Sequence, residues 1–185
     1  WMSTHTLFAS LPNLISLGRL ILVPVIVALI AQMSWDWAFA LFLVAGLSDA
    51  IDGWLAKRFN LSTELGAYLD PIADKALLVS IYVSLAVVGV LPAAIAILVV
   101  SRDLMIVSAV LVSWVMDKPV AIRPLLVSKL NTLAQIAFAT LVLLAKAAGW
   151  ETGPWLSYAL YVVATLTLAS ALAYLVQWLR HMELY

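Results

Sequence analysis

Long apolar stretches separated by short polar turns dominate the chain. Six of them approach the ~20 residues that a helix needs to cross the hydrocarbon core of a bilayer. They cover residues 13–32, 35–57, 66–89, 92–115, 127–148 and 154–178. Glycine, proline and polar residues mark the breaks at 33–36, 60–64, 89–92 and 149–154. The pattern predicts an all-α, polytopic integral membrane protein with six transmembrane helices. Because these connections are short, we expect one domain over residues 1–185.

Composition agrees with a membrane location and excludes several function classes. Of 185 residues, 65% are hydrophobic and 11% are charged, whereas soluble domains are roughly half apolar and one quarter charged. The formal net charge is +0, so we expect no nucleic-acid partner, since such proteins usually carry a basic surplus. The chain has no cysteine, which excludes disulfides, thiolate metal sites and a cysteine nucleophile.

The distribution of lysine and arginine predicts the orientation in the membrane. If six helices alternate in direction, one side receives most basic residues: Arg19, Lys57, Arg58, Lys75, Lys118, Arg123, Lys129 and Arg180. Lys146 alone lies near the other side. Cytoplasmic loops carry the positive excess, so we expect both termini and the basic side to be cytoplasmic. The expected location is a bacterial inner (plasma) membrane, with the mitochondrial inner membrane as the alternative.

Four aspartates stand near the expected cytoplasmic ends of the second and third helices. Asp49 and Asp52 are spaced i, i+3, and Asp70 and Asp74 are spaced i, i+4, so each pair shares a helix face. An Asp inside a membrane segment costs about 2.5 to 3.5 kcal/mol on insertion scales. Antiparallel packing of the two helices is expected to bring the four carboxylates together, where they would repel one another without a cation.

The ligand types indicate which cation to expect. Carboxylate oxygens suit a hard divalent ion, and the chain offers no cysteine and no paired histidines for zinc. We therefore expect Mg²⁺ or Mn²⁺, whose remaining ligands usually include substrate phosphates. Isolated intramembrane aspartates also pair with Lys or Arg, or mark an ion pathway. Lys57 and Arg58, taken alone, are most simply cytoplasmic anchors.

The run from Asp49 to Asp74 resembles the signature of the CDP-alcohol phosphotransferase family, D-x-x-D-G-x-x-A-R-x(8)-G-x-x-x-D-x-x-x-D. Seven of its eight specified residues match at the same spacing. The exception is Lys57, where the family usually has arginine. Either Lys57 holds the same phosphate as a point charge, or Arg58 serves from the next position.

Other segments extend the resemblance over most of the chain. Residues 12–19 are similar to the family's opening segment, in which an asparagine and an arginine approach the active site, here Asn13 and Arg19. Residues 101–103 and 127–135 look most like the eukaryotic-type cardiolipin synthases, which also occur in bacteria. Phosphatidylglycerophosphate synthases share related elements.

The resemblance implies a six-helix CDP-alcohol phosphotransferase fold, a homodimer, and CDP-diacylglycerol entering from the bilayer as donor. It implies two divalent ions held by Asp49, Asp52, Asp70 and Asp74, with Asp74 also the catalytic base. The nucleotide and diphosphate would be bound by Asp52, Gly53, Ala56, Lys57 and Gly66.

The acceptor is expected to be anionic. Arg102 lies near the middle of the fourth helix, and Asp103 beside it is expected to point to another face, so a carboxylate from a neighbouring helix is one explanation of this charge. The other is that Arg102, Arg123 and Lys129 attract an acceptor phosphate. Phosphatidylglycerol would give cardiolipin and CMP, and glycerol 3-phosphate would give phosphatidylglycerophosphate.

Two other function classes fit the same residues less well. A metal-cation transporter or channel would place carboxylates nearer the midplane, without flanking glycines and basic residues. A catalytically inactive structural membrane protein would not need all four aspartates.

Overall fold

Six α-helices make up the computed structural model, which describes residues 3–59, 64–117 and 125–183, with side chains for 14–56, 58, 70–117 and 125–183. They are α1 (Ser3–Ala31), α2 (Trp35–Phe59), α3 (Glu64–Val87), α4 (Ala93–Val115), α5 (Leu126–Ala147) and α6 (Pro154–Glu183). The prediction of an all-α fold is confirmed. The largest differences from the predicted limits are at α1, which begins ten residues before residue 13, and at α6, which ends five residues after 178. The other predicted limits differ by one or two residues at most.

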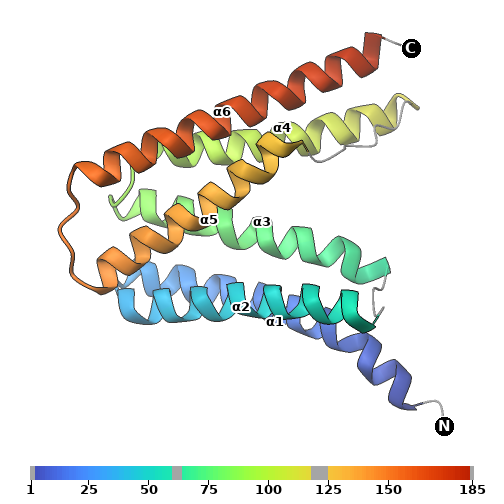
Figure 1. Ribbon diagram of the computed structural model, residues 1–185, viewed down its shortest axis with the longest axis horizontal. Helices are drawn as coiled ribbons and strands as arrows, with labels where there is room; N and C mark the ends of the chain where they lie inside the picture. The colour runs from blue at the N-terminus through green and yellow to red at the C-terminus, as the bar shows by residue number, and fades with distance from the viewer. Residues whose placement is uncertain (1–2, 60–63, 118–124, 184–185) are drawn as a thin grey trace.

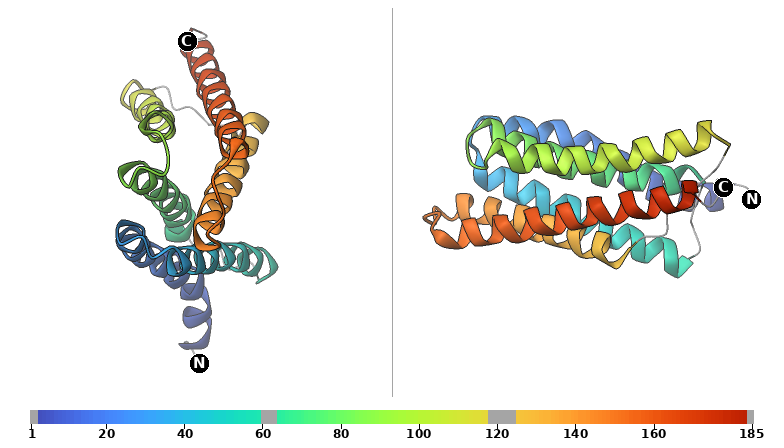
Figure 2. Two further views of the ribbon diagram at one scale, coloured as in Figure 1. Left: turned by 90° about the vertical axis from the view of Figure 1, so that its left-hand side faces the viewer. Right: turned by 90° about the horizontal axis from the view of Figure 1, so that it is seen from above.

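The helices run alternately in opposite directions, so α1 starts and α6 ends at the same end of the bundle (Figure 1). We call this the terminal end. Within the described residues, neighbouring helices form a closed ring in the order α1, α3, α4, α6, α5, α2, and α3 also contacts α5 across the ring. Figure 2 shows this arrangement from the end and from above. A pocket bordered by α2, α3 and α5 can therefore lie inside the bundle.

The turns at the end opposite the termini share a residue with positive φ and a backbone hydrogen bond that caps the preceding helix. Gly89 and Gly149 end α3 and α5 with φ of 81° and 68°, and in the first turn the Val90 amide donates to the Leu85 carbonyl at 2.9 Å. A left-handed residue with such a bond satisfies carbonyls that the helix leaves open. Met33, with φ of 57°, closes α1 in the same way. The predicted breaks at 33–36, 89–92 and 149–154 are confirmed, and residues 60–63 lie outside the described chain.

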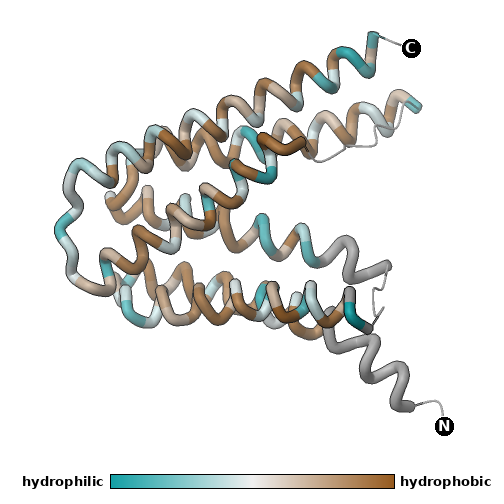
Figure 3. Tube along the Cα trace, in the orientation of Figure 1, coloured by the Kyte–Doolittle hydropathy of each residue, from teal (hydrophilic) through white to brown (hydrophobic). Residues whose placement is uncertain are grey.

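The apolar core occupies the half of the bundle away from the terminal end. It combines late residues of α1, α3 and α5 with early residues of α2, α4 and α6, including Ile30, Phe42, Ile81, Val99 and Leu143. Figure 3 shows that hydrophilic residues gather mainly in the other half. Interhelical packing and hydrogen bonds, rather than removal of apolar surface from water, hold helices together in lipid. The polar half is thus where an enzyme site can form.

Length and composition identify five helices of the described chain that can cross a membrane. The sixth, α3, carries Asp70, Asp74 and Lys75 within its described part, which lowers its hydropathy. It runs beside the other five through the bundle (Figure 1). Large apolar side chains are exposed on the outside of the bundle, for example Leu111, Leu133 and Val162, as lipid-facing positions require.

Candidate functional site

A buried arginine from α1 joins the aspartates of α2 and α3. The Arg19 side chain is 1% exposed, and its Nη2 lies 3.0 Å from Asp49 Oδ1 and 3.8 Å from Asp52 Oδ2. Its Nη1 donates to Asp74 Oδ1. One guanidinium therefore contacts carboxylates from both halves of the family motif, which a planar group with donors on several edges can do.

The fourth aspartate is also held from α1, since the Ser16 hydroxyl donates to Asp70 Oδ1. Ser16 and Arg19 lie three residues apart and so share one face of α1. The expectation that α2 and α3 pack directly on each other is wrong for the described backbone, in which both helices pack on α1. The physical reason is that the Ser16 hydroxyl and the Arg19 guanidinium of α1 supply donors to carboxylates of both helices, which would otherwise repel one another.

The cluster carries more negative charge than Arg19 can compensate. Three carboxylates contact the one guanidinium and the fourth, that of Asp70, is bound by the uncharged Ser16 hydroxyl. The four together leave three negative charges in surplus when all are ionised. Asp52 is 4% exposed, and neither of its oxygens has a hydrogen-bond partner among the described residues. Buried polar atoms in proteins almost always have a hydrogen-bond partner, so these two oxygens are candidates for binding a ligand.

The ligand types of these residues suit a hard divalent cation, but their positions do not form a complete coordination site. Within the described chain, no three acidic or histidine side chains are arranged so that they could hold a metal ion. The candidate donors are all carboxylate oxygens, and the two buried oxygens of Asp52 accept no hydrogen bond within the described residues. A cation would therefore compete with Arg19 for the same oxygens.

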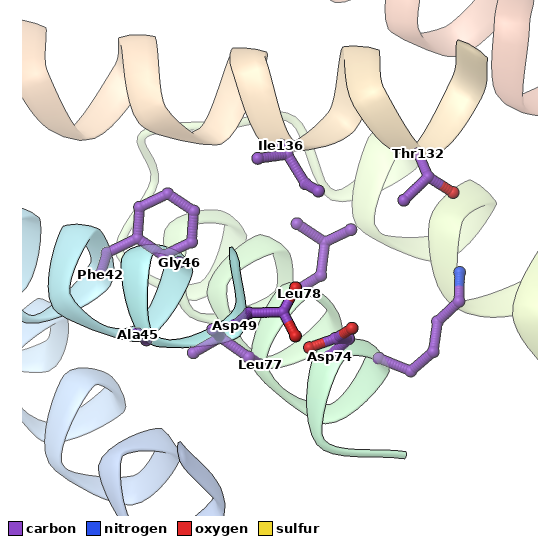
Figure 4. Close-up of a pocket in the computed structure, with 10 residues that line it drawn as sticks. Phe42, Ala45, Gly46, Asp49, Asp74, Leu77, Leu78, Thr132 and Ile136 are labelled. Carbon is purple, nitrogen blue, oxygen red and sulfur yellow. The ribbon is translucent and has the colours of Figure 1, made fainter. Parts of the chain in front are cut away.

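An amphiphilic pocket adjoins the cluster between α2, α3 and α5. Asp49 and Asp74 point their carboxylates toward each other at its polar end, with Thr132 of α5 across from them (Figure 4). Phe42 and Ile136 line the apolar part. Such a pocket can take a molecule with a polar head and an apolar body.

Arg102 lies at the junction of α4, α5 and α6 rather than on an open surface. It is 3% exposed, and its Nη1 donates to Asp103 Oδ1 at 2.6 Å. Its Nη2 also donates to Ser128 of α5 and Ser170 of α6, at 2.5 and 3.0 Å. The ring of Tyr174 lies 5.6 Å from the guanidinium carbon.

The expectation about Asp103 needs correction. Asp103 does neutralise Arg102, because the long arginine side chain bends back to its neighbour, and serines rather than a carboxylate come from the facing helices. Asp103 also accepts from Lys75 Nζ at 3.0 Å, which ties α4 to α3. The sequence reasoning missed Ser16, Lys75 and the two serines. Lys75 directly follows the last aspartate of the motif, and Ser16 and Ser128 lie in the segments 12–19 and 127–135 that resemble the family, but nothing in the sequence indicated their partners.

The remaining predicted site residues differ in how far the structure describes them. Gly53 is exposed, and an added side-chain carbon would meet nothing within 4 Å there, so space is open beside Asp52. Ala56 is half-buried one turn further, and Lys129 is exposed near the start of α5. The side chains of Asn13 and Lys57, the surroundings of Gly66 and the whole of Arg123 lie outside the described residues.

Comparison with known proteins completes the description of the site. Residues 9–178 match the CDP-alcohol phosphatidyltransferase family model. The chain is 30% identical over 181 residues to a rat cardiolipin synthase (CMP-forming), covering 89% of this chain and 60% of that protein. It is 30% identical over 191 residues to the human cardiolipin synthase (CMP-forming), covering 93% of this chain and 64% of that protein.

A bacterial relative is similar over nearly its whole length. The chain is 35% identical over 187 residues to the Escherichia coli (strain K12) CDP-diacylglycerol–glycerol-3-phosphate 3-phosphatidyltransferase, covering 90% of this chain and 93% of that protein. By contrast, the chain spans less than two thirds of the two cardiolipin synthases. With the family model matched over most of the sequence and the motif aspartates gathered around Arg19, the chain belongs to the CDP-alcohol phosphatidyltransferase family.

Proposed function

We propose that this protein transfers the phosphatidyl group of CDP-diacylglycerol to a hydroxyl of phosphatidylglycerol, which yields cardiolipin and CMP. The observation that carries the proposal is the gathering of the four motif aspartates around α1, beside an amphiphilic pocket. The cluster provides oxygens for a cation-bound diphosphate, and the pocket suits a molecule with both a polar and an apolar part.

The proposed cofactor is Mg²⁺ or Mn²⁺, with two ions held by Asp49, Asp52, Asp70 and Asp74. The support is the all-oxygen donor set, its surplus of negative charge and the buried oxygens of Asp52, which accept no hydrogen bond within the described residues. When bound, such ions would neutralise the donor's diphosphate and the charge that develops on the departing CMP.

The chain's own residues have separate proposed tasks. Asp74 takes the proton from the acceptor hydroxyl while that oxygen forms a bond to the phosphorus that carries diacylglycerol. The bond from this phosphorus to the CMP oxygen breaks in line, and CMP leaves. Asp74 suits this task because it is half exposed in the pocket and Arg19 contacts only its Oδ1. Gly53, Ala56 and Lys57 border the nucleotide.

The second candidate acceptor is glycerol 3-phosphate, which would give phosphatidylglycerophosphate. The near-complete coverage of the E. coli relative favours it. The apolar wall formed by Phe42 and Ile136 favours a lipid acceptor, as does the similarity of residues 101–103 and 127–135 to cardiolipin synthases. We propose phosphatidylglycerol as the acceptor.

A product assay decides between the two acceptors. Purified protein receives radiolabelled CDP-diacylglycerol with phosphatidylglycerol or glycerol 3-phosphate, and the lipid products are separated by chromatography. We expect cardiolipin and CMP, no product in EDTA, and recovery with Mg²⁺ or Mn²⁺. Full activity in EDTA would contradict the metal. Phosphatidylglycerophosphate without cardiolipin would contradict the acceptor and leave the family chemistry intact.

We further propose that the protein is a homodimer in a bacterial inner membrane, with both termini and the carboxylates on the cytoplasmic side. The support for this orientation is that the described Arg58, Lys75, Lys129 and Arg180 belong to the terminal half of the bundle, whereas Lys146 ends α5 at the other side. A cation transporter of similar architecture would carry Mn²⁺ into liposomes without releasing CMP, so flux and release assays separate the two classes.

A further inference from the structure

The pocket between α2, α3 and α5 has a basic residue that the family motif does not specify. Its polar end contains Asp49, Asp74, Lys75 and Thr132. The acidic pair belongs to the proposed metal and base chemistry, and Thr132 is uncharged. Lys75 is thus the cation of this pocket, and it follows the proposed base directly in sequence.

Lys75 belongs to a group in which two cations share one carboxylate. Asp103 Oδ1 accepts from Lys75 Nζ at 3.0 Å and from Arg102 Nη1 at 2.6 Å. One positive charge is therefore left over within this group of three. The Arg102 side chain is 3% exposed and is hydrogen-bonded to serines of two other helices, while the Lys75 side chain is 40% exposed. The surplus charge is accessible at Lys75.

We infer that Lys75 binds the phosphate of the acceptor, in exchange for its ion pair with Asp103, and so brings the acceptor's hydroxyl to Asp74. The ligand class is a glycerol phosphate, esterified or free, because both forms carry a phosphate at one end of a three-carbon unit and a primary hydroxyl at the other. Lys75 and Asp74 line the same pocket and match these two groups.

The geometry distinguishes Lys75 from Arg102, the residue that the sequence favoured for this task. The guanidinium of Arg102 is buried and its Nε, Nη1 and Nη2 all have protein partners, so binding a phosphate would break several hydrogen bonds. The ammonium of Lys75 has three donors and one recorded partner in the described chain. Lys75 is the more exposed partner of this ion pair, with 40% of its side chain exposed against 14% for Asp103, so its ammonium can contact a phosphate by exchanging one protein contact.

The inference rests on the proposed phosphatidyl transfer and is tested by separating acceptor KM from donor KM. In Lys75→Gln we expect the acceptor KM to rise about tenfold or more, as losing a charge-assisted contact implies, with the CDP-diacylglycerol KM unchanged. Lys75→Arg should retain most of the affinity. Asp103→Asn is the matched variant, because it removes the same ion pair while leaving the ammonium in the pocket, so it should not raise the acceptor KM.

Each outcome has a defined meaning. Equal effects of Lys75→Gln and Asp103→Asn, or equal shifts in both KM values, would show a structural ion pair and overturn the inference. If Asp103→Asn does not fold in detergent, the KM split in Lys75→Gln decides alone. Running the assay with phosphatidylglycerol and with glycerol 3-phosphate identifies the source of the phosphate. Wild-type protein that transfers to neither would overturn the proposed function and this inference together.

Discussion

At the residue scale, the four aspartates occupy different environments and should respond differently to loss of charge. Asp52 is almost fully buried, while the side chains of Asp49 and Asp74 are each 47% exposed. Burial makes an oxygen a better cation ligand and a poorer proton acceptor from a diffusing substrate. The two tasks proposed for the cluster can therefore be assigned to different members of it.

Substitution of Asp52 and Asp74 separates metal binding from proton transfer. Asp52→Asn should weaken metal binding, so that raising Mg²⁺ recovers much of the rate. Asp74→Asn also removes the proposed base, so the rate should stay about 100-fold or more below wild type at any Mg²⁺ concentration. Steady-state rates across a Mg²⁺ titration provide the measurement. Wild-type turnover in Asp74→Asn would rule out its role as base.

Arg19 should compete with the metal, because both neutralise the same oxygens. In Arg19→Gln we expect the metal-free protein to be less stable and Mn²⁺ to bind about tenfold more tightly, which corresponds to ~1.4 kcal/mol. Mn²⁺ binding is measured by the electron paramagnetic resonance of the free ion at mildly alkaline pH. Arg102→Gln, which removes another buried arginine outside this cluster, is the control and should leave Mn²⁺ affinity unchanged. Weaker binding in Arg19→Gln would instead make Arg19 an organiser of the ligands.

Single substitutions at Lys57 and Arg58 test which of the two contacts the donor phosphate. If Lys57 holds the donor phosphate by charge alone, Lys57→Ala should lower kcat/KM about tenfold and Lys57→Arg should preserve or raise it. Arg58→Ala is the companion variant. A silent Lys57→Ala beside a strongly impaired Arg58→Ala would assign the contact to Arg58.

At the scale of helices, hydrogen bonds between buried polar side chains fix how α5 and α6 pack. Thr167 of α6 is fully buried, donates to Asn131 Oδ1 at 2.8 Å and accepts from Gln135 Nε2 at 3.1 Å. Tyr82 of α3 in turn donates to the backbone carbonyl of Gln135 at 2.9 Å. These contacts define the rotation of α5, which carries Thr132 into the pocket.

Removing the Thr167 hydroxyl should loosen this packing. Thr167→Val keeps the shape but leaves two buried polar groups without their partner, and we expect a loss of about 1 kcal/mol in the free energy of unfolding. Thr167→Ser should lose less. Thr165→Val, at an exposed position of the same helix, serves as control, and unfolding in mixed micelles measures all three. Equal stability of Thr167→Val and wild type would contradict the assignment.

The sequence predicted helices and motif residues better than contacts between helices. Turns of glycine, proline or short polar residues have a local cause, so three breaks were predicted correctly. The aspartates were found because their spacing is fixed within single helices. The placement of Arg19 between α2 and α3, and of Ser128 and Ser170 on Arg102, depends on the relative rotation of separate helices. A serine in an apolar helix carries no signal of its future partner, because small polar residues are common at membrane helix interfaces.

At the scale of the whole molecule, the alternating direction of the helices distributes charged side chains unevenly between the two halves of the bundle. The carboxylate cluster, the start of α1 and the end of α6 lie in the terminal half, and the apolar core lies in the other. Interfacial aromatic residues mark the far side, where Lys146 Nζ lies 6.0 Å from the ring of Trp35. The same asymmetry makes the topology testable.

The absence of cysteine from the sequence makes orientation measurable with single-cysteine variants. Arg180→Cys lies near the end of α6, and Glu151→Cys lies in the turn between α5 and α6; both positions are exposed. With cytoplasmic termini, an impermeant maleimide should label Glu151→Cys in bacterial spheroplasts and Arg180→Cys only in inside-out vesicles. Labelling of both from one side would contradict six membrane crossings, and the reverse pattern would contradict the orientation.

The packing of α2 and α3 on α1 has a dynamic consequence. Local opening, in which one segment leaves while the rest stays folded, requires less free energy than global unfolding. If α1 detaches, one event withdraws the guanidinium from three carboxylates and the hydroxyl from the fourth. The carboxylates then repel, while α3, α4, α5 and α6 keep their mutual contacts. Hydrogen exchange in the amides of α1 would therefore report how often an otherwise folded molecule loses its active centre.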